Sequence, residues 1–173
     1  QYTTIGYIYL WIGAYEKTIE YFEKSLSIRE SIGNNYLIAN SLRSLGIFYF
    51  WQGEYENSIQ YLERSIKIMQ EEKKDNYKKD LGITSYLNLS YKHLGRDYDE
   101  EKILSMLKDE NMDEIDYIYN FIFNDLLEDK LFLERSYNMI RGKSEWLDDE
   151  KMEKFLNYPI PKQIIEEWEK VNA

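Results

Sequence analysis

The chain has 173 residues with 32 acidic and 22 basic side chains, a net charge of −10 and no cysteine. This balance disfavours a nucleic-acid partner, because binding to a phosphate backbone requires a basic face. The lack of cysteine excludes disulfides and thiolate zinc sites and fits the cytoplasm, where we expect the protein to reside. The longest apolar run, Ile5–Ile12, is too short to cross a bilayer, so we expect no membrane partner.

A first pair of helices is expected at the start of the chain. Residues 1–12 show a helical pattern that is already under way at Gln1, so we interpret the chain as part of a longer signalling or regulatory protein. A turn at Gly13 leads to a second helix, predicted over residues 15–32, and Gly33 ends it because glycine favours the left-handed conformation after a helix. The apolar side chains of this second helix recur at helical spacing: Tyr15, Ile19, Phe22 and Leu26.

A second pair of helices repeats the first at an offset of 40 residues. The segment Gly53–Ile68 aligns with Gly13–Ile28, and eight of its sixteen positions are identical. Self-similarity at a fixed period is typical of stacked-repeat proteins. The repeated pattern predicts helices over residues 36–52 and 55–74.

The repeated segment resembles the tetratricopeptide repeat, in a form with a period of 40 residues. The resemblance depends on glycine, aromatic and small side chains in the second copy: Leu45, Gly46, Tyr49, Gly53, Glu54, Tyr55, Ser58, Leu62 and Ser65. It implies an all-α fold, a right-handed solenoid of helical hairpins in which small residues let paired helices approach closely. It also implies a concave groove, lined by the first helix of each hairpin, that receives peptides or partner helices.

Glycine in the middle of a helix costs ~1 kcal/mol relative to alanine, so its recurrence needs a compensating contact. Gly46 recurs as Gly6 in the first copy. We therefore interpret both glycines as points where the two helices of a hairpin touch.

The similarity to the repeat weakens towards the C-terminus. A third copy places Asn88 where the contact glycine is expected and has one extra residue between Gly95 and Tyr98. Further helices are expected over residues 112–127 and 131–140, as a degenerate fourth hairpin, and over 146–156 and 161–171, the last one starting at Pro161. The predicted division is three hairpins over residues 1–107 (1–32, 36–74 and 77–107), a degenerate hairpin over 108–141 and capping helices over 142–173.

The register of the repeats predicts which side chains face the groove. Trp11 and Trp51 occupy the same position in consecutive copies, and His93 takes that position in the third copy. Aromatic and arginine side chains are typical anchors of protein contacts. The alternative is that both tryptophans pack between hairpins. The expected partner-binding residues are Tyr7, Trp11, Arg43, Ile47, Phe50, Trp51, Leu89, Lys92 and His93.

No catalytic constellation is evident, so we expect a protein that is not an enzyme and uses no cofactor or metal. His93 is the single histidine, which leaves no histidine-based metal cluster, and phosphate-loop and metalloprotease motifs are missing. A lone histidine near the end of a helix is more often a surface or capping residue than a functional one. Intrinsic hydrolase or transferase activity is therefore the least favoured function.

The acidic side chains are concentrated in one segment. Residues 97–129 hold twelve acids and two lysines, a net charge of −10, while the rest of the chain is neutral. One interpretation is structural, since carboxylates in the first turn of a helix offset its dipole. The other is a docking patch for a cationic partner. That acidic patch would comprise Asp109, Glu110, Asp113, Glu114 and Asp116.

The sequence thus predicts a non-catalytic protein–protein interaction module that binds a peptide or partner protein through its groove. The alternative is a peptide-sensing regulatory domain whose solenoid changes curvature on binding. The first helix predicts a further contact, because it carries no charge and more apolar surface than one neighbouring helix covers. We expect an upstream repeat or a second copy of the chain to cover its apolar side chains, which are Tyr2, Ile5, Ile8, Tyr9 and Ile12.

Overall fold

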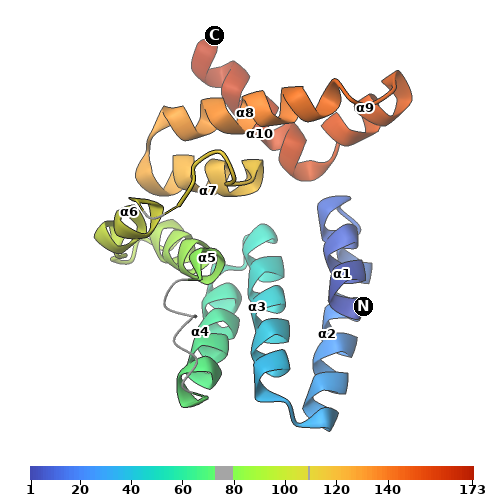
Figure 1. The fold of residues 1–173 in the computed structure, drawn as a ribbon, viewed down its shortest axis with the longest axis vertical. Coiled ribbons are helices and arrows are strands. Elements are labelled where there is room, and N and C mark those ends of the chain that lie inside the picture. Colours follow the sequence, from blue (N-terminus) through green and yellow to red (C-terminus); the bar gives the residue numbers. More distant parts are fainter. Residues whose placement is uncertain (73–79, 109) are drawn as a thin grey trace.

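The computed structural model describes residues 1–72, 80–108 and 110–173, and this part of the chain is all-α, as predicted (Figure 1). Residues 74 and 77, where the second predicted hairpin ends and the third begins, lie outside the described residues. The helices are α1 (Tyr2–Trp11), α2 (Tyr15–Ile32), α3 (Asn35–Trp51), α4 (Tyr55–Glu71), α5 (Leu81–His93), α6 (Glu100–Lys108), α7 (Tyr117–Leu127), α8 (Lys130–Ser144), α9 (Asp149–Leu156) and α10 (Pro159–Asn172).

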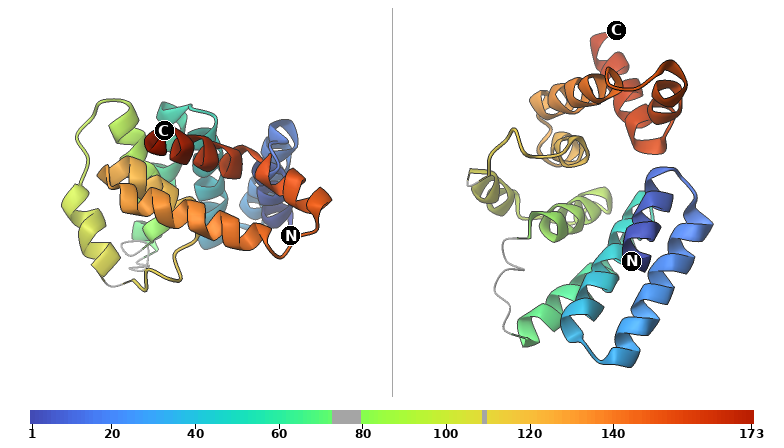
Figure 2. Two further views of the ribbon diagram at one scale, coloured as in Figure 1. Left: turned by 90° about the horizontal axis from the view of Figure 1, so that it is seen from above. Right: turned by 45° about the vertical axis from the view of Figure 1, so that its right-hand side comes forward.

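The first four helices form two antiparallel hairpins, α1/α2 and α3/α4, which stand side by side (Figures 1 and 2). In both hairpins, a glycine lets the two helices come into close contact. A Cβ atom added at Gly46 would lie 2.6 Å from Leu62 Cγ of α4, and one added at Gly6 would overlap the Phe22 ring of α2. The close contact predicted at both glycines is therefore present, and it fixes the distance between paired helices.

Small hydroxyl side chains join α3 to its neighbours. Ser65 Oγ of α4 donates a hydrogen bond of 2.8 Å to the Ala39 carbonyl of α3. On the other side of α3, Arg29 of α2 donates a 2.8 Å bond to Ser41 Oγ. Each buried hydroxyl thus has a partner, so serine is tolerated between closely packed helices.

The third hairpin differs from the first two because its two helices do not pack closely against each other. Asn88 is buried at the position of the contact glycine, and its side chain donates to the Thr84 carbonyl and accepts from the backbone N–H of Asp99. The second helix of the hairpin starts at Glu100, five residues after Gly95, whereas α4 starts two residues after its turn glycine. The larger side chain and the longer turn displace α6 from α5 (Figure 1).

The C-terminal helices α7 to α10 form a second layer across one end of the repeats (Figures 1 and 2). α7 packs directly against α5 and pairs with α8, and α10 packs against α8. The core of this layer contains Ile140 and Ile164, and Trp11 and Trp51 contact it as well as the core of the repeats. The two tryptophans therefore link the repeats to the C-terminal layer.

All four C-terminal helices begin at other residues than the sequence predicts, although α8 begins only one residue early, at Lys130. α7 begins at Tyr117 rather than at residue 112, because the Asp116 side chain accepts the backbone N–H of Ile118 and caps the helix. α9 begins at Asp149 rather than at Trp146, because Asp148 caps it in the same way. α10 begins at Pro159 rather than Pro161, since proline is favoured at the first helical position and Pro159 is the earlier one.

The first helix is partly covered by its own hairpin. Tyr2 and Tyr9 lie on Tyr21 of α2, with ring centroids 6.1 and 5.4 Å apart. Ile8 and Ile12 remain 55% and 41% exposed. The apolar surface predicted on this helix is therefore present but reduced to two isoleucines one helical turn apart.

Candidate functional site

The candidate site is a groove between the repeats and the C-terminal layer. Its floor consists of α1, α3 and α5, the first helices of the three hairpins, and its opposite wall consists of α7, α8 and α10. The groove contains two hollows, which we name the His93 cavity, of about 320 Å³, and the Arg43 cavity, of about 400 Å³. Each is lined by residues from both layers, so the site exists only because α7 folds back on α5.

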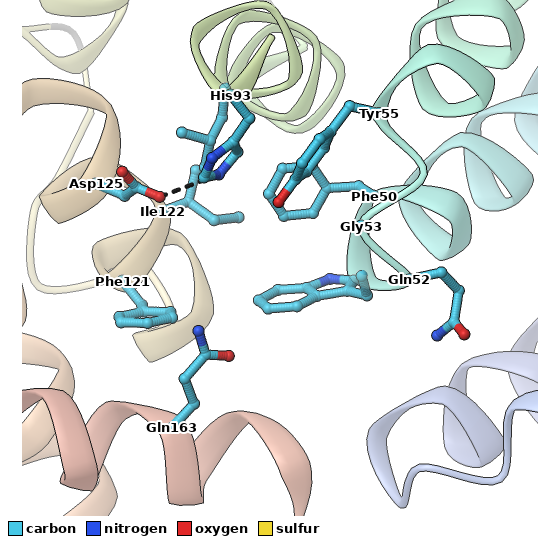
Figure 3. Close-up of a pocket in the computed structure, with 11 residues that line it drawn as sticks. Phe50, Gln52, Gly53, Tyr55, His93, Phe121, Ile122, Asp125 and Gln163 are labelled. Carbon is cyan, nitrogen blue, oxygen red and sulfur yellow. Dashed lines mark ion pairs between the residues drawn. The ribbon is translucent and has the colours of Figure 1, made fainter.

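The His93 cavity has aromatic walls and one carboxylate (Figure 3). The rings of Tyr55 and His93 stack, with centroids 4.4 Å apart and an interplanar angle of 13°. On the other side of the imidazole, His93 Nε2 lies 3.2 Å from Asp125 Oδ2 of α7. Phe121 of α7 and Gln163 of α10 complete the wall opposite Tyr55 (Figure 3).

The environment of Tyr55 further favours the protonated form of its phenol, which already predominates at neutral pH. Burial raises the pKa of Tyr55, and the Asp125 carboxylate raises it further. At neutral pH the hydroxyl can therefore both donate and accept a hydrogen bond. Figure 3 shows this hydroxyl directed towards the interior of the cavity.

The Arg43 cavity is polar and electrostatically balanced. Arg43 pairs with Asp80 at 2.8 Å, and Lys143 of α8 pairs with Asp116 at 3.1 Å. Tyr7 and Tyr119 also line it, and burial raises the pKa of Tyr119 to about 12 although the Arg43 charge opposes that shift. Each charged group thus has a partner of opposite sign inside the protein, which leaves this cavity without a strong preference for ligand charge.

The structure brings eight of the nine predicted groove residues to these two cavities. Tyr7, Trp11, Arg43 and Ile47 line the Arg43 cavity, and Phe50, Trp51, Leu89 and His93 line the His93 cavity. The burial of Ile47, Phe50 and Leu89 is nearly complete, at 5%, 7% and 2% exposure.

Lys92 lies apart from both cavities and has a structural role. Its Nζ donates to the carbonyl oxygens of Asp125 and Leu126 at 2.6 and 3.4 Å, and it pairs with Glu128 at 2.8 Å. These are the last carbonyls of α7, which have no partner within the helix. Lys92 therefore caps α7 and holds it against α5.

Both tryptophans pack inside the protein, and both also line a cavity of the groove. Trp51 Nε1 donates a 3.2 Å hydrogen bond to the Tyr86 hydroxyl, and the ring contacts the C-terminal core. Trp11 also contacts that core. Each ring nevertheless keeps part of its surface open to a cavity, so packing and groove lining are not exclusive.

Sequence reasoning missed the residues that the C-terminal layer contributes. Phe121, Asp125 and Gln163 reach the His93 cavity from helices that share no repeat register with α5. The position of Asp125 was a weak indication of function, because a carboxylate in the last turn of a helix opposes the helix dipole and so does not stabilise the helix. Nothing in the sequence signals Gln163.

The acidic patch is largely engaged in internal contacts. Asp113 pairs with Arg135 at 2.9 Å, Asp116 pairs with Lys143, and Glu114 accepts from Asn111 at 3.0 Å. Glu110 is exposed, and Asp109 lies outside the described residues. Asp113 and Glu114 precede α7 instead of occupying its first turn, so Asp116 alone acts at the start of that helix.

Within the described ranges, no group of three or more His, Cys, Asp or Glu side chains has the arrangement of a metal site. The same part of the chain has no helix that is both long enough and apolar enough to span a membrane.

Closed helical hairpins that repeat at a fixed interval define the N-terminal half of the molecule as a helical-repeat array. Residues 2–71 match the family model described as tetratricopeptide repeat. This part of the chain is therefore a tetratricopeptide repeat segment, as the sequence predicted. Searches of curated proteins and of solved structures found no match.

Proposed function

We propose that the protein is a non-catalytic interaction module that binds an extended segment of a partner protein in the groove between the repeats and the C-terminal layer. Tetratricopeptide repeats generally mediate protein–protein interaction. The observation that supports this groove most directly is the alignment of two cavities on α1, α3 and α5. Both cavities combine aromatic walls with a few polar groups, which is typical of binding sites.

A variant that fills the groove tests this proposal better than one that removes a tryptophan. Trp51→Ala would also remove the hydrogen bond to Tyr86 and a contact with the C-terminal core. Gln163 is exposed on α10 and lines the His93 cavity. Gln163→Trp should fill this cavity and prevent binding without removing a core contact.

The matched control is Glu169→Trp, an equally large substitution at an exposed position of α10 that lines neither cavity. Partners are captured from the source cell with the protein as bait, and the bound segments are mapped by crosslinking. We expect Gln163→Trp to abolish capture and Glu169→Trp to retain it. Equal capture by both variants would show that binding occurs elsewhere, with the acidic patch as the next surface to test.

A second candidate function is peptide sensing, and the position of the cavities favours it. A ligand in the His93 cavity touches α5 and α10 together, so it contacts both layers and can change the angle between them. The chain has no cysteine, so spin labels can be placed at chosen positions. Labels at Lys24→Cys and Lys151→Cys should change their distance distribution when the captured segment binds, whereas an unchanged distribution would indicate a rigid scaffold.

We also propose that α1 mediates weak self-association through Ile8 and Ile12. Both side chains are exposed, Ile8 within α1 and Ile12 at the C-cap that ends it, four residues further along the chain. An exposed apolar pair of this kind is small compared with a stable interface, which buries more than about 1,000 Å². The association should therefore be concentration-dependent.

A further inference from the structure

We propose that the His93 cavity binds a cationic side chain, arginine or lysine, of the segment that occupies the groove, with Asp125 as its counter-ion. This inference specifies the ligand of the groove and therefore rests on the proposed function. It is carried by the charge inside the cavity, by its aromatic walls and by its size.

The charge argument begins with Asp125. Its side chain is 44% exposed and lies in the last turn of α7, where a negative charge opposes the helix dipole. The neighbouring Lys92 is engaged by α7 carbonyls and Glu128. Among the described residues, the ion pair of Asp125 is with His93, which carries a charge only when protonated. The carboxylate thus remains available to a cation from outside.

The walls of the cavity suit a cation with an apolar stem. Trp51, Tyr55 and Phe121 line it, and the faces of aromatic rings attract ammonium and guanidinium groups. Tyr55 and Gln163 add oxygen acceptors for the N–H groups that Asp125 does not reach. An anionic side chain would instead meet the Asp125 carboxylate directly.

The size of the cavity fits one side chain. A volume of about 320 Å³ is at the lower end of the range for ligand sites, so it accommodates one long side chain while the peptide backbone follows the groove. The net charge of the whole molecule also favours a cationic ligand. A net charge of −10 raises the local concentration of cationic ligands and favours their encounter with the groove.

The test uses short peptides as probes, and NMR on the full chain measures their binding. Acetyl-Gly-Gly-Arg-Gly-Gly-amide, its lysine analogue and its glutamine analogue are titrated separately, and the four tryptophan indole resonances are followed. The arginine and lysine peptides should shift the Trp51 indole resonance and leave that of the exposed Trp146 unchanged. The glutamine peptide should bind at least about tenfold more weakly, a difference of about 1.4 kcal/mol.

Two charge-matched variants separate the cavity from the general acidity of the protein. Asp125→Asn and Glu134→Gln each remove one negative charge, but Glu134 is exposed on α8 and lines neither cavity. Asp125→Asn should lower the affinity for the arginine peptide about tenfold, because the counter-ion is lost, whereas Glu134→Gln should leave it within about twofold. Equal weakening by both variants would show diffuse attraction and overturn the proposal.

A second substitution keeps the test valid if Asp125→Asn disturbs α7. Phe121→Leu retains an apolar side chain but removes one aromatic face, and it should weaken the cationic peptides more than the glutamine peptide. If all three peptides bind equally and shift Trp51, the groove binds segments without preferring a cation, so the proposed function stands and this inference fails. If no segment captured by the protein contacts the groove, the proposed function fails first.

Discussion

The second and third hairpins of the array differ at the position where paired helices touch and in the length of their turns, and these differences affect where the C-terminal half packs. Gly46 lets α3 and α4 touch, because any Cβ there would overlap Leu62. Asn88 occupies the same position in α5 and uses its amide to bind the turn that follows. The third hairpin therefore stays open, and α7 packs on α5 more extensively than α6 does.

Opening the third hairpin has a functional consequence. In a regular array the groove would continue past α5 as an open concave surface. Here α7 covers α5 on the groove side, with Tyr119 against Tyr86 and Asp125 against His93. The altered contact residue and the longer turn together turn an open surface into a groove with two walls and two cavities.

The largest expected effect comes from closing the space at Gly46. Gly46→Ala should destabilise the protein although alanine favours the helix, because its Cβ would lie 2.6 Å from Leu62 Cγ and 3.2 Å from the Ser58 carbonyl. Gly46→Leu should cost ~3 kcal/mol or more, the range of severe overpacking. Urea denaturation monitored by circular dichroism measures both changes.

Gly142 provides the control for this substitution. It lies inside α8, and a Cβ atom there would meet nothing within 4 Å. Gly142→Ala should therefore stabilise the protein by up to ~1 kcal/mol, which is the intrinsic preference of a helix for alanine. If Gly46→Ala and Gly142→Ala change stability in the same direction, the close-contact explanation of the second hairpin is wrong.

The closed hairpins could be predicted from the sequence because their determinants are local and repeated. Gly46, Tyr55 and the apolar stripe of α4 recur at fixed spacing, so the helices, the contact glycines and the groove-facing positions followed from the pattern. The wall of the site could not be predicted. Asp125 and Gln163 reach it only because the third hairpin is open and α7 packs on α5, and that three-dimensional consequence is not encoded in any spacing along the chain.

The start of α7 shows a smaller limit of sequence reasoning. Acidic residues are favoured both at the N-cap and in the first turn, so Asp113, Glu114 and Asp116 allowed several starting points. The structure selects Asp116, whose side chain reaches the N–H of Ile118. Composition alone could not distinguish the cap from its neighbours.

The contact that holds α7 on the open hairpin should have the next largest effect. Lys92→Met retains most of the apolar stem but removes the charged donor to the last carbonyls of α7. Hydrogen bonds to charged groups contribute about 1.5–3 kcal/mol, so we expect a loss of about 2 kcal/mol. Lys102→Met, at an exposed position of α6, should change the free energy of unfolding by less than about 0.5 kcal/mol.

Hydrogen exchange locates the effect of Lys92→Met. The amides of α7 should exchange faster than in the wild type, while those of α3 and α4 should be unchanged. Faster exchange spread evenly over both hairpins would mean that Lys92 does not act on α7 specifically.

The amide of Asn88 should contribute less than Lys92, because its bonds are between neutral groups. Asn88→Ala removes the acceptor for the Asp99 N–H and should cost about 1 kcal/mol. Asn138→Ala, at an exposed position of α8, is the control and should have little effect. Thermal denaturation is sufficient to compare them, and equal melting temperatures for Asn88→Ala and Asn138→Ala would contradict a role for Asn88 in ordering the open turn.

The smallest effect on folding is expected at the opposite end of the array, where Ile8 of α1 stays exposed and, among the described residues, no C-terminal helix packs over α1 as α7 packs over α5. Ile8 is 55% exposed on α1, and Leu131 is equally exposed, at 56%, on α8. Either residue changed to lysine should alter the free energy of unfolding by less than about 0.5 kcal/mol, as is usual for surface positions.

The two variants should nevertheless differ in association. A lysine at position 8 places a charge where a second copy would bury apolar surface, and burial of an unpaired charge is strongly unfavourable. Light scattering over a range of concentrations should therefore show association for the wild type and for Leu131→Lys, and a monomer for Ile8→Lys. A wild type that stays monomeric throughout would show that the two isoleucines of α1 are not a contact between copies, because the substitution would then have no association to remove.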